Sequence, residues 1–182
     1  MHITREKITT KIPIQRKGTK YVARARSHLN EGVAVIIAVR DMLKLARTAK
    51  DVKEMIKEKL LKINNRIVSD YHESIKLFNV FEAGKTYKLS ILPTGKFYFE
   101  ELKGKHETRI CKVIGKKLVK KGAIQLNLHD GTNVIVPAKD KIMINDSVEL
   151  DFSNKLKKHT ILEKGANVFV ISGKYVGLKG KA

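Results

Sequence analysis

The chain has 182 residues, of which 42% are apolar, which suffices for modest cores in one large domain or two or three small ones. Lys and Arg number 38 against 18 Asp and Glu, a formal net charge of +20 that favours a polyanionic partner, nucleic acid ahead of an anionic membrane. No apolar run approaches the roughly 20 residues of a membrane span, and the amino terminus lacks the apolar core of a secretory signal, so we expect a cytoplasmic protein.

Residues 1–31 are predicted to form a basic N-terminal arm. Glu6 is the sole acid before residue 31, and apolar periodicity is almost absent, so the segment cannot bury enough surface to fold by itself. A solvated tail is one interpretation. We favour an arm that becomes ordered against phosphates, with the candidate RNA-binding residues Arg16, Lys17, Lys20, Arg24 and Arg26.

Residues 32–84 are predicted to form two amphipathic helices and a short hairpin. Apolar residues recur at helical spacing in two stretches: Val35, Val39, Met42, Leu43 and Ala46, then Val52, Met55, Ile56 and Leu60. Thr48 occupies the N-cap position of the second helix, with Asp51 three residues on as an acidic variant of the capping box. Asn64-Asn65 fits a two-residue turn, because Asn tolerates positive φ.

Cationic side chains share faces of these two predicted helices. Arg40, Lys44 and Arg47 are spaced by four and three residues, and Lys50, Lys53 and Lys57 by three and four. Arg66 follows in the hairpin. Ordinary solvation of a charged face is the alternative, but two cationic strips beside a hairpin resemble the small RNA-binding motif of primary rRNA-binding ribosomal proteins and of several RNA-modifying enzymes.

Residues 85–162 are predicted to form a central, mostly β domain, since short apolar runs separated by Gly, Asn or Asp extend from about residue 71 to residue 152. Asp130-Gly131 in "IQLNLHDGTNVIV" predicts a type I′ hairpin turn. His129 beside Asp130 has no further partner for catalysis or metal binding, and the other histidines show no ligand spacing. Cys111 is the single cysteine, and we interpret it as a small buried hydrophobe. No catalytic residue, metal or cofactor is predicted.

Residues 163–182 contain "GANVFVISGKYVGLKGKA", in which glycines alternate with short apolar runs. This order resembles the KOW motif, a small β-barrel module common in ribosomal and transcription-factor proteins, and predicts a partial KOW-like module. A tight loop rich in glycine lets the backbone approach a partner closely.

The segments together resemble the archaeal and eukaryotic small-subunit ribosomal proteins of the S-four-e family. The resemblance runs from about Pro13 to the last residue and is carried by "PIQRKGTKY", "VIIAVRDMLKLA", "CKVIGKKLVKKGAIQLNLHDGTN" and "GANVFVISGKYVGLKG". It implies an α+β, multi-module fold: a helix-helix-hairpin RNA-binding domain, a mostly β central domain and a small β-barrel end of the KOW or SH3-like type. By motif, the RNA-facing positions are Arg40, Lys44, Arg47, Thr48, Lys50, Lys53 and Arg66, with Lys174, Tyr175 and Lys179 in the KOW-like loop.

The resemblance implies a non-catalytic, ribosome-bound constituent of the small subunit. Its partners would be small-subunit rRNA and neighbouring ribosomal proteins, with no membrane and no small-molecule substrate. Three alternatives remain at this point: an RNA-modifying enzyme, a free RNA chaperone or translation regulator, and a transcription factor. The enzyme is disfavoured because no paired carboxylate, activated nucleophile or phosphate-cradling glycine loop is found.

Overall fold

The computed structural model describes residues 2–27, 29–104, 106–119, 122–137 and 140–182. The protein is mostly β structure with a few short helices, arranged in two compact units. Unit 1 is Met1–Gly104 with Phe169–Leu178, and unit 2 is Lys105–Val168 with Lys179–Ala182. Each unit has its own apolar core, as a compact domain does. The division into four modules remains a prediction.

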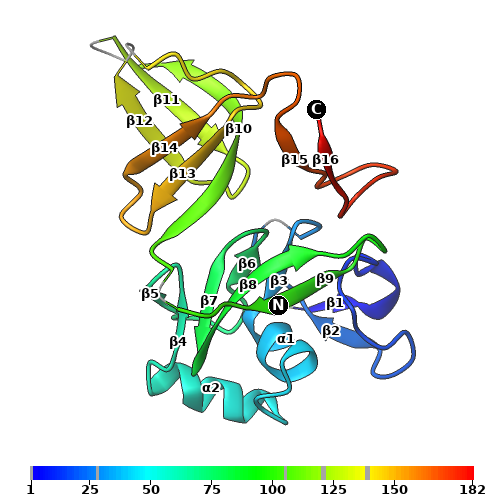
Figure 1. The fold of residues 1–182 in the computed structure, drawn as a ribbon. Coiled ribbons are helices and arrows are strands. Elements are labelled where there is room, and N and C mark those ends of the chain that lie inside the picture. The colour runs from blue at the N-terminus through cyan, green and yellow to red at the C-terminus, as the bar shows by residue number, and fades with distance from the viewer. Residues whose placement is uncertain (1, 28, 105, 120–121, 138–139) are drawn as a thin grey trace. The chain divides into compact units, whose positions relative to one another are not determined.

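Unit 1 contains a five-stranded antiparallel sheet with the order β5-β4-β7-β8-β9 (Figure 1). Its strands are β4 (Leu61–Ile63), β5 (Arg66–Ile67), β7 (Val80–Ala83), β8 (Lys85–Ile91) and β9 (Phe97–Glu101). Two further strand pairs, β1-β2 and β3-β6, belong to this unit. These strands and the helical segments are β1 (His2–Thr4), η1 (Arg5–Lys7), β2 (Tyr21–Ala23), β3 (Gly32–Ala34), α1 (Val35–Ile37), η2 (Ala38–Met42), α2 (Ala49–Lys57) and β6 (Ser74–Lys76).

The first helix is shorter and more buried than the amphipathic helix predicted from the sequence. Helical structure covers α1 and η2 and ends at Met42, and residues 33–39 are at most 3% exposed. A helix that is apolar all round is a core element. The chain then turns at Lys44, whose φ is 56°. The predicted cationic helix face of Arg40, Lys44 and Arg47 is therefore wrong, because the last two residues lie beyond the helix.

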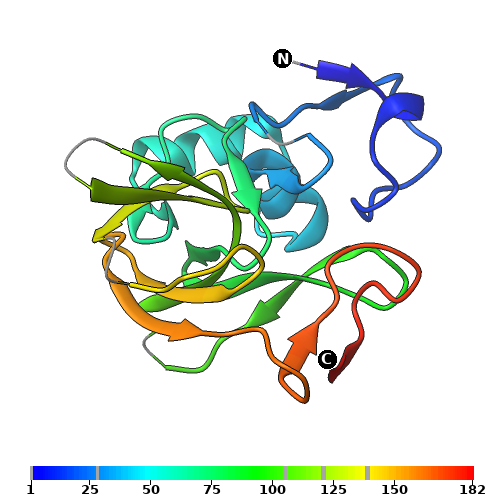
Figure 2. The ribbon, with the colours of Figure 1, turned by 90° about the horizontal axis from the view of Figure 1, so that it is seen from above.

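The N-terminal segment packs against unit 1, in contrast to the basic arm predicted from the sequence. β1 pairs with β2, and a long loop joins them, as Figure 2 shows for the blue part of the chain. Ile12, Val22 and Ala25 are buried in the core of unit 1. The Phe97 N–H donates to the Lys11 carbonyl (2.7 Å), which ties the loop to β9. These apolar residues are too widely spaced to give a periodic signal.

Unit 2 contains a five-stranded antiparallel sheet with the order β12-β11-β10-β13-β14 (Figure 1). Its strands are β10 (Thr108–Leu118), β11 (Ala123–Leu128), β12 (Asn133–Pro137), β13 (Ser147–Asp151) and β14 (Leu156–Thr160). The strands predicted from the apolar runs of the central region are confirmed. Alternate residues of these strands fill the core, together with Ile142 from the segment between β12 and β13: Cys111, Val113, Leu126, Leu128, Val134, Val136, Val148 and Leu150.

The turn between β11 and β12 lies where the sequence predicts it but is of another type. Gly131 has φ of 76° and donates its N–H to the Leu128 carbonyl (2.9 Å), whereas Asp130 is not among the described residues with positive φ. The connection is thus a three-residue loop with Gly at its left-handed position, and the predicted type I′ turn is wrong. The Asp130 side chain points inward, 3.2 Å from Nη2 of Arg109.

Residues 169–178 form a loop that packs on unit 1. The ring of Phe169 lies 5.6 Å from that of Phe78, and the Gly177 N–H donates to the Val170 carbonyl (2.7 Å). A Cβ at Gly177, where φ is 79°, would overlap the backbone of Leu92, so this close approach requires glycine. All residues from 163 to 182 are described, and their strands pair in a two-stranded sheet, β15 (Asn167–Phe169) with β16 (Lys179–Lys181).

Candidate nucleic-acid interface

Helix α2 presents Lys50 and Lys53, both exposed and one helical turn apart. Its N-terminus is closed by the predicted capping box: Thr48 Oγ1 accepts the Asp51 N–H (3.2 Å), and Asp51 Oδ2 accepts the Thr48 N–H (2.9 Å). The Thr48 hydroxyl also donates to Asp51 Oδ1 (2.7 Å), and these hydrogen bonds lower the pKa of Asp51. Thr48 thus positions the helix that carries the two lysines, and a direct RNA contact by Thr48 remains a prediction.

The hairpin of β4 and β5 presents Arg66. Asn64 and Asn65 join the strands with φ values of 49° and 62°, so the two-residue turn predicted from the sequence is confirmed. Asn64 Oδ1 accepts the Val80 N–H (2.9 Å), which fixes the turn against β7. The Arg66 side chain is 65% exposed.

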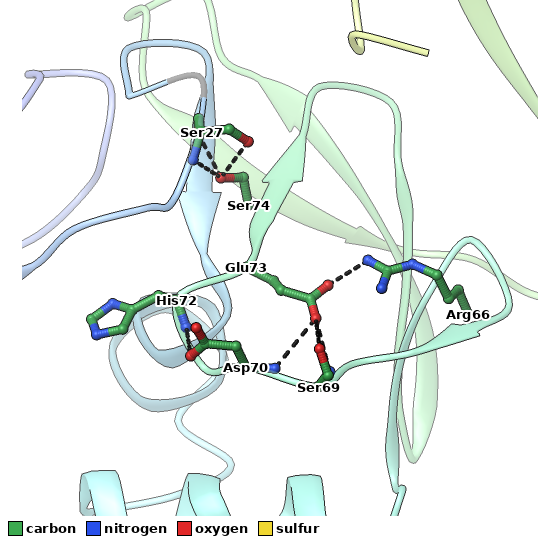
Figure 3. Close-up of polar contacts among 7 residues, drawn as sticks. All are labelled: Ser27, Arg66, Ser69, Asp70, His72, Glu73 and Ser74. Carbon is green, nitrogen blue, oxygen red and sulfur yellow. Dashed lines mark hydrogen bonds and ion pairs between the residues drawn. The ribbon is translucent and has the colours of Figure 1, made fainter. Parts of the chain in front are cut away.

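Residues 69–74, called here the linking segment, hold Arg66 through Glu73 (Figure 3). Arg66 Nη2 donates to Glu73 Oε2, and Glu73 Oε1 accepts the Ser69 N–H and hydroxyl, each at 2.8 Å. Partial burial alone would raise the pKa of Glu73, but these hydrogen bonds and the Arg66 charge hold it below its ordinary value. Glu73 is therefore ionised at neutral pH. Within the described chain, Arg66 forms its side-chain hydrogen bond through Nη2. The other N–H donors of the guanidinium remain for solvent or a ligand.

The linking segment also holds the N-terminal segment. His72 Nδ1 donates to the Arg24 carbonyl (2.9 Å), and the His72 carbonyl accepts the Arg26 N–H (2.8 Å). Figure 3 shows Ser74 beside Ser27, where the Ser74 hydroxyl donates to the Ser27 carbonyl (2.6 Å). The exposed residues Arg24 and Arg26 are thereby anchored to this part of unit 1.

Helix α2 meets the same segment through an aromatic contact. Lys53 Nζ lies 5.1 Å from the centre of the Tyr71 ring, and that ring lies 4.2 Å from the His72 ring. Three separate parts of the chain that carry exposed cations thus contact residues 69–74. We call these cations, together with Lys50 one helical turn from Lys53, the basic surface, and its members are Arg24, Arg26, Lys50, Lys53 and Arg66.

The residues that assemble the basic surface were missed in the sequence. Tyr71, His72 and Glu73 carry no spacing signal, and the partners of Tyr71 and His72 lie far away along the chain. An aromatic pair beside a carboxylate, directly after the hairpin, was the one available hint. Such a surface can bind a chain of phosphates, because lysine and arginine supply affinity that depends little on base sequence.

The structure leaves three other predicted RNA-binding residues out of the basic surface. Arg40 forms a bidentate ion pair with Asp41 (2.8 and 2.9 Å), and this hydrogen bonding raises the pKa of Arg40. Lys44 and Arg47 border a shallow hollow whose lining also includes three acids. The lining residues are Lys44, Leu45, Ala46, Arg47, Asp51, Glu54, Met55 and Glu58. Acids balance these cations, so the hollow is less suited to a polyanion than the basic surface is.

Two further groups of predicted residues are exposed elsewhere. Arg16, Lys17 and Lys20 lie on the loop between β1 and β2. Tyr175 is 61% exposed on the 169–178 loop, with Lys174 Nζ 5.7 Å from its ring centre. An exposed tyrosine can stack on an unpaired base. The last predicted residue is the exposed Lys179, the first residue of β16.

The His129–Asp130 pair belongs to a buried structural cluster in unit 2. Cys111 Sγ donates to Asp130 Oδ2 (3.7 Å), and burial together with the Asp130 charge raises the pKa of Cys111 to about 12. That thiol is protonated at neutral pH and cannot act as a nucleophile. His129 Nδ1 accepts the Lys112 N–H (3.1 Å), which ties the turn to β10. In the described ranges no group of His, Cys, Asp or Glu could hold a metal ion, and no helix is long and apolar enough to cross a membrane.

Two relatives decide the family. The small ribosomal subunit protein eS4 of Methanocella arvoryzae is 30% identical over 187 residues, which cover 99% of this chain and 79% of the relative. The eS4 protein of Pyrobaculum aerophilum is 32% identical over 193 residues, which cover 99% of this chain and 80% of the relative. The chain belongs to ribosomal family S4e.

Other comparisons agree with membership of the S4e family. The family's sequence profile matches residues 83–170. The crystal structure of the 30S ribosomal protein S4e from Thermoplasma acidophilum superposes with a TM-score of 0.73 at 20% identity, covering 84% of this chain and 80% of that one. The family that the sequence motifs resemble is therefore confirmed. Of the α+β fold that was predicted, the structure and its similarity to S4e support the coarser statement of mostly β structure with few helices.

Proposed function

We propose that the protein is a structural constituent of the small ribosomal subunit that binds small-subunit rRNA and supports subunit assembly and translation. Membership of the S4e family supports the ribosomal role, since the relatives are named as small ribosomal subunit proteins. The contacts of Arg66, Lys53 and the backbone of Arg24 and Arg26 with the linking segment carry the RNA-binding part. The protein would work on the ribosome in the cytoplasm, beside other ribosomal proteins and without a catalytic role.

The finer assignment follows the sequence motifs. The helical segments α1, η2 and α2 with the β4-β5 hairpin would form the small RNA-binding domain, and residues 163–182 would form a partial KOW-like module. The basic surface is the main contact in this proposal. The other candidate RNA contacts are Arg16, Lys17, Lys20, Arg40, Lys44, Arg47, Thr48, Lys174, Tyr175 and Lys179.

The geometry suits phosphate binding because the cations are held before RNA arrives. Glu73 restrains Arg66, the Tyr71 ring restrains Lys53, and backbone hydrogen bonds anchor the chain at Arg24 and Arg26. A restrained cation loses less side-chain entropy on binding than a free one. Guanidinium groups also pair with phosphate oxygens through two parallel hydrogen bonds.

The proposal is tested by a double substitution on α2, Lys50→Ala with Lys53→Ala. RNA affinity is measured by fluorescence anisotropy between about 50 and 200 mM salt, with a small-subunit rRNA fragment and an unrelated RNA of equal length. We expect weaker binding to both RNAs and a log–log salt slope that flattens by at most about one unit per lost phosphate contact.

A matched control removes the same charge elsewhere. Lys157→Ala with Lys158→Ala alters two exposed lysines of β14 in unit 2. We expect this variant to keep the wild-type slope. Equal slopes for the wild type and the α2 variant would remove the basic surface from the proposal.

A further inference from the structure

The loop of residues 15–20, "QRKGTK", folds around the guanidinium of Arg5; we call it the Arg5 loop. Arg5 Nε donates to the Thr19 carbonyl (2.8 Å), Nη1 to the Gln15 carbonyl, and Nη2 to Thr19 Oγ1 (3.1 Å). The Arg5 backbone N–H donates to the Lys20 carbonyl (2.9 Å). All three guanidinium nitrogens are thus used inside the protein, which gives Arg5 a positioning role distinct from the exposed cations beside it.

Gly18 allows the loop to close on Arg5. Its φ is +148°, a backbone conformation that L side chains rarely adopt, and a Cβ there would lie 2.9 Å from Nη2 of Arg5. A side chain at position 18 would therefore push the guanidinium away from the carbonyls that it binds.

The closed loop exposes backbone donors. Its carbonyls at positions 15, 19 and 20 accept from Arg5, whereas the N–H groups of residues 16–19 have no acceptor within the described chain. Residues 15–20 are all exposed, so a ligand in solvent can reach this loop. The side chains of Arg16, Lys17 and Lys20 add three exposed cations to the same short loop. Clustered backbone N–H groups in a turn bind anions, and neighbouring cations strengthen that preference.

We propose that the Arg5 loop is a preformed anion-binding loop that takes a phosphodiester group of RNA. This rests on the proposed RNA-binding function and adds a site in which backbone N–H groups contact the phosphate while Arg5 sets their geometry. The expected ligand is the RNA backbone, because the donors recognise phosphate oxygens and read no base.

The test is Gly18→Ala, which changes no charge. We expect RNA affinity to fall roughly threefold to tenfold, with little change in the log–log salt slope because no cation is removed. The probe is a labelled small-subunit rRNA fragment. The backbone amide signals of residues 16–19 are followed by NMR in the same titration, and we expect RNA to shift them in the wild type and much less in the variant.

Gly84→Ala is the matched control, since Gly84 also has positive φ (+75°) but a Cβ there meets nothing within 4 Å. We expect this variant to bind RNA like the wild type. Arg5→Lys keeps the charge but loses the planar fork, so it should lose affinity as Gly18→Ala does. If Gly18→Ala or Arg5→Lys bound RNA with wild-type affinity and wild-type amide shifts, the proposal would be overturned.

Two further outcomes separate the sources of failure. A wild-type protein that bound no RNA would refute the proposed function itself, whereas wild-type binding with an unaffected Gly18→Ala variant would refute the loop alone. Titration with orthophosphate at constant ionic strength is the last arm. If orthophosphate saturated the amide shifts of residues 16–19 at lower concentration than RNA phosphates do, the site would belong to a free anion and the RNA assignment would fall.

Discussion

Replacing Asp130 by Ala is expected to destabilise unit 2 strongly, because it leaves the charge of Arg109 buried without its partner. The two side chains are 3% and 5% exposed and 3.2 Å apart. Arg109 Nη2 would retain Thr132 Oγ1 (3.1 Å) and Asn154 Oδ1 (2.8 Å), but its Nε already lacks a partner in the described structure. Removing one member of a buried ion pair costs about 3–5 kcal/mol. The Thr132 N–H, which donates to Asp130 Oδ1 (2.8 Å), also loses its acceptor.

The thiol of Cys111 reports this loss directly. It is the single cysteine of the chain, lies 1% exposed in the core of unit 2, and is unreactive while buried, where its pKa is about 12. Tyrosine fluorescence does not report on the unfolding of unit 2, because all five tyrosines lie in unit 1. When opening is at equilibrium, labelling by a thiol reagent follows the open population, so about 3–5 kcal/mol corresponds to a rate roughly a hundredfold to several thousandfold higher.

His129→Ala is the control in the same turn. It removes the hydrogen bond from the Lys112 N–H and should cost about 1 kcal/mol, roughly a fivefold change in labelling rate. If Asp130→Ala labelled no faster than His129→Ala, Asp130 would not be the residue that stabilises the buried charge of Arg109. That result would refute the predicted loss of stability.

Three other predictions concern unit 1, where thermal melting followed by tyrosine fluorescence is the measurement. Lys59 lies just after the C-cap of α2 and has φ of 59°; its N–H donates to the Ile56 carbonyl, and the Leu60 N–H donates to the Met55 carbonyl. Lys59→Gly should therefore stabilise the unit by up to about 1 kcal/mol, whereas a gain with Lys59→Ala would point to a different cause. Thr48→Ala should lower the free energy of unfolding by about 1 kcal/mol, because it removes the capping box. An unchanged melting temperature would count against a stabilising role of this cap. The pKa of Glu73 is lower in the folded protein than its ordinary 4.5, so its contribution to stability is fully present above that value and is lost as pH falls through the lower folded pKa. Glu73→Gln should therefore melt lower than the wild type at pH 7 and converge with it in acid; a constant difference down to about pH 3 would contradict the assignment.

Features set by neighbouring residues could be predicted from the sequence. The capping box of Thr48 and Asp51 and the turn of Asn64 and Asn65 depend on contacts within a few residues, and both are confirmed. The strands also follow from local alternation. The Asp-Gly turn shows the limit: its position is local, but its type differs because Asp130 turns inward to Arg109 on another strand.

The prediction of the first helix was wrong for a related reason. Helical spacing of apolar residues indicates a helix, but it does not say that residues 33–39 are buried on every side or that the chain turns at Lys44. Cations could likewise be named as candidates from the sequence, but their grouping could not. Arg24 and Lys53 join Arg66 in one group because both contact the linking segment from distant parts of the chain.

Sucrose-gradient sedimentation would show whether the protein is a constituent of the small ribosomal subunit. Lysate from cells that express the chain from its own gene is fractionated at low and then high salt, and the protein is quantified against small subunits. We expect near-stoichiometric sedimentation with small subunits that persists at several hundred millimolar salt. Recovery at the top of the gradient, or release at modest salt, would contradict it and make the protein a free RNA-binding factor.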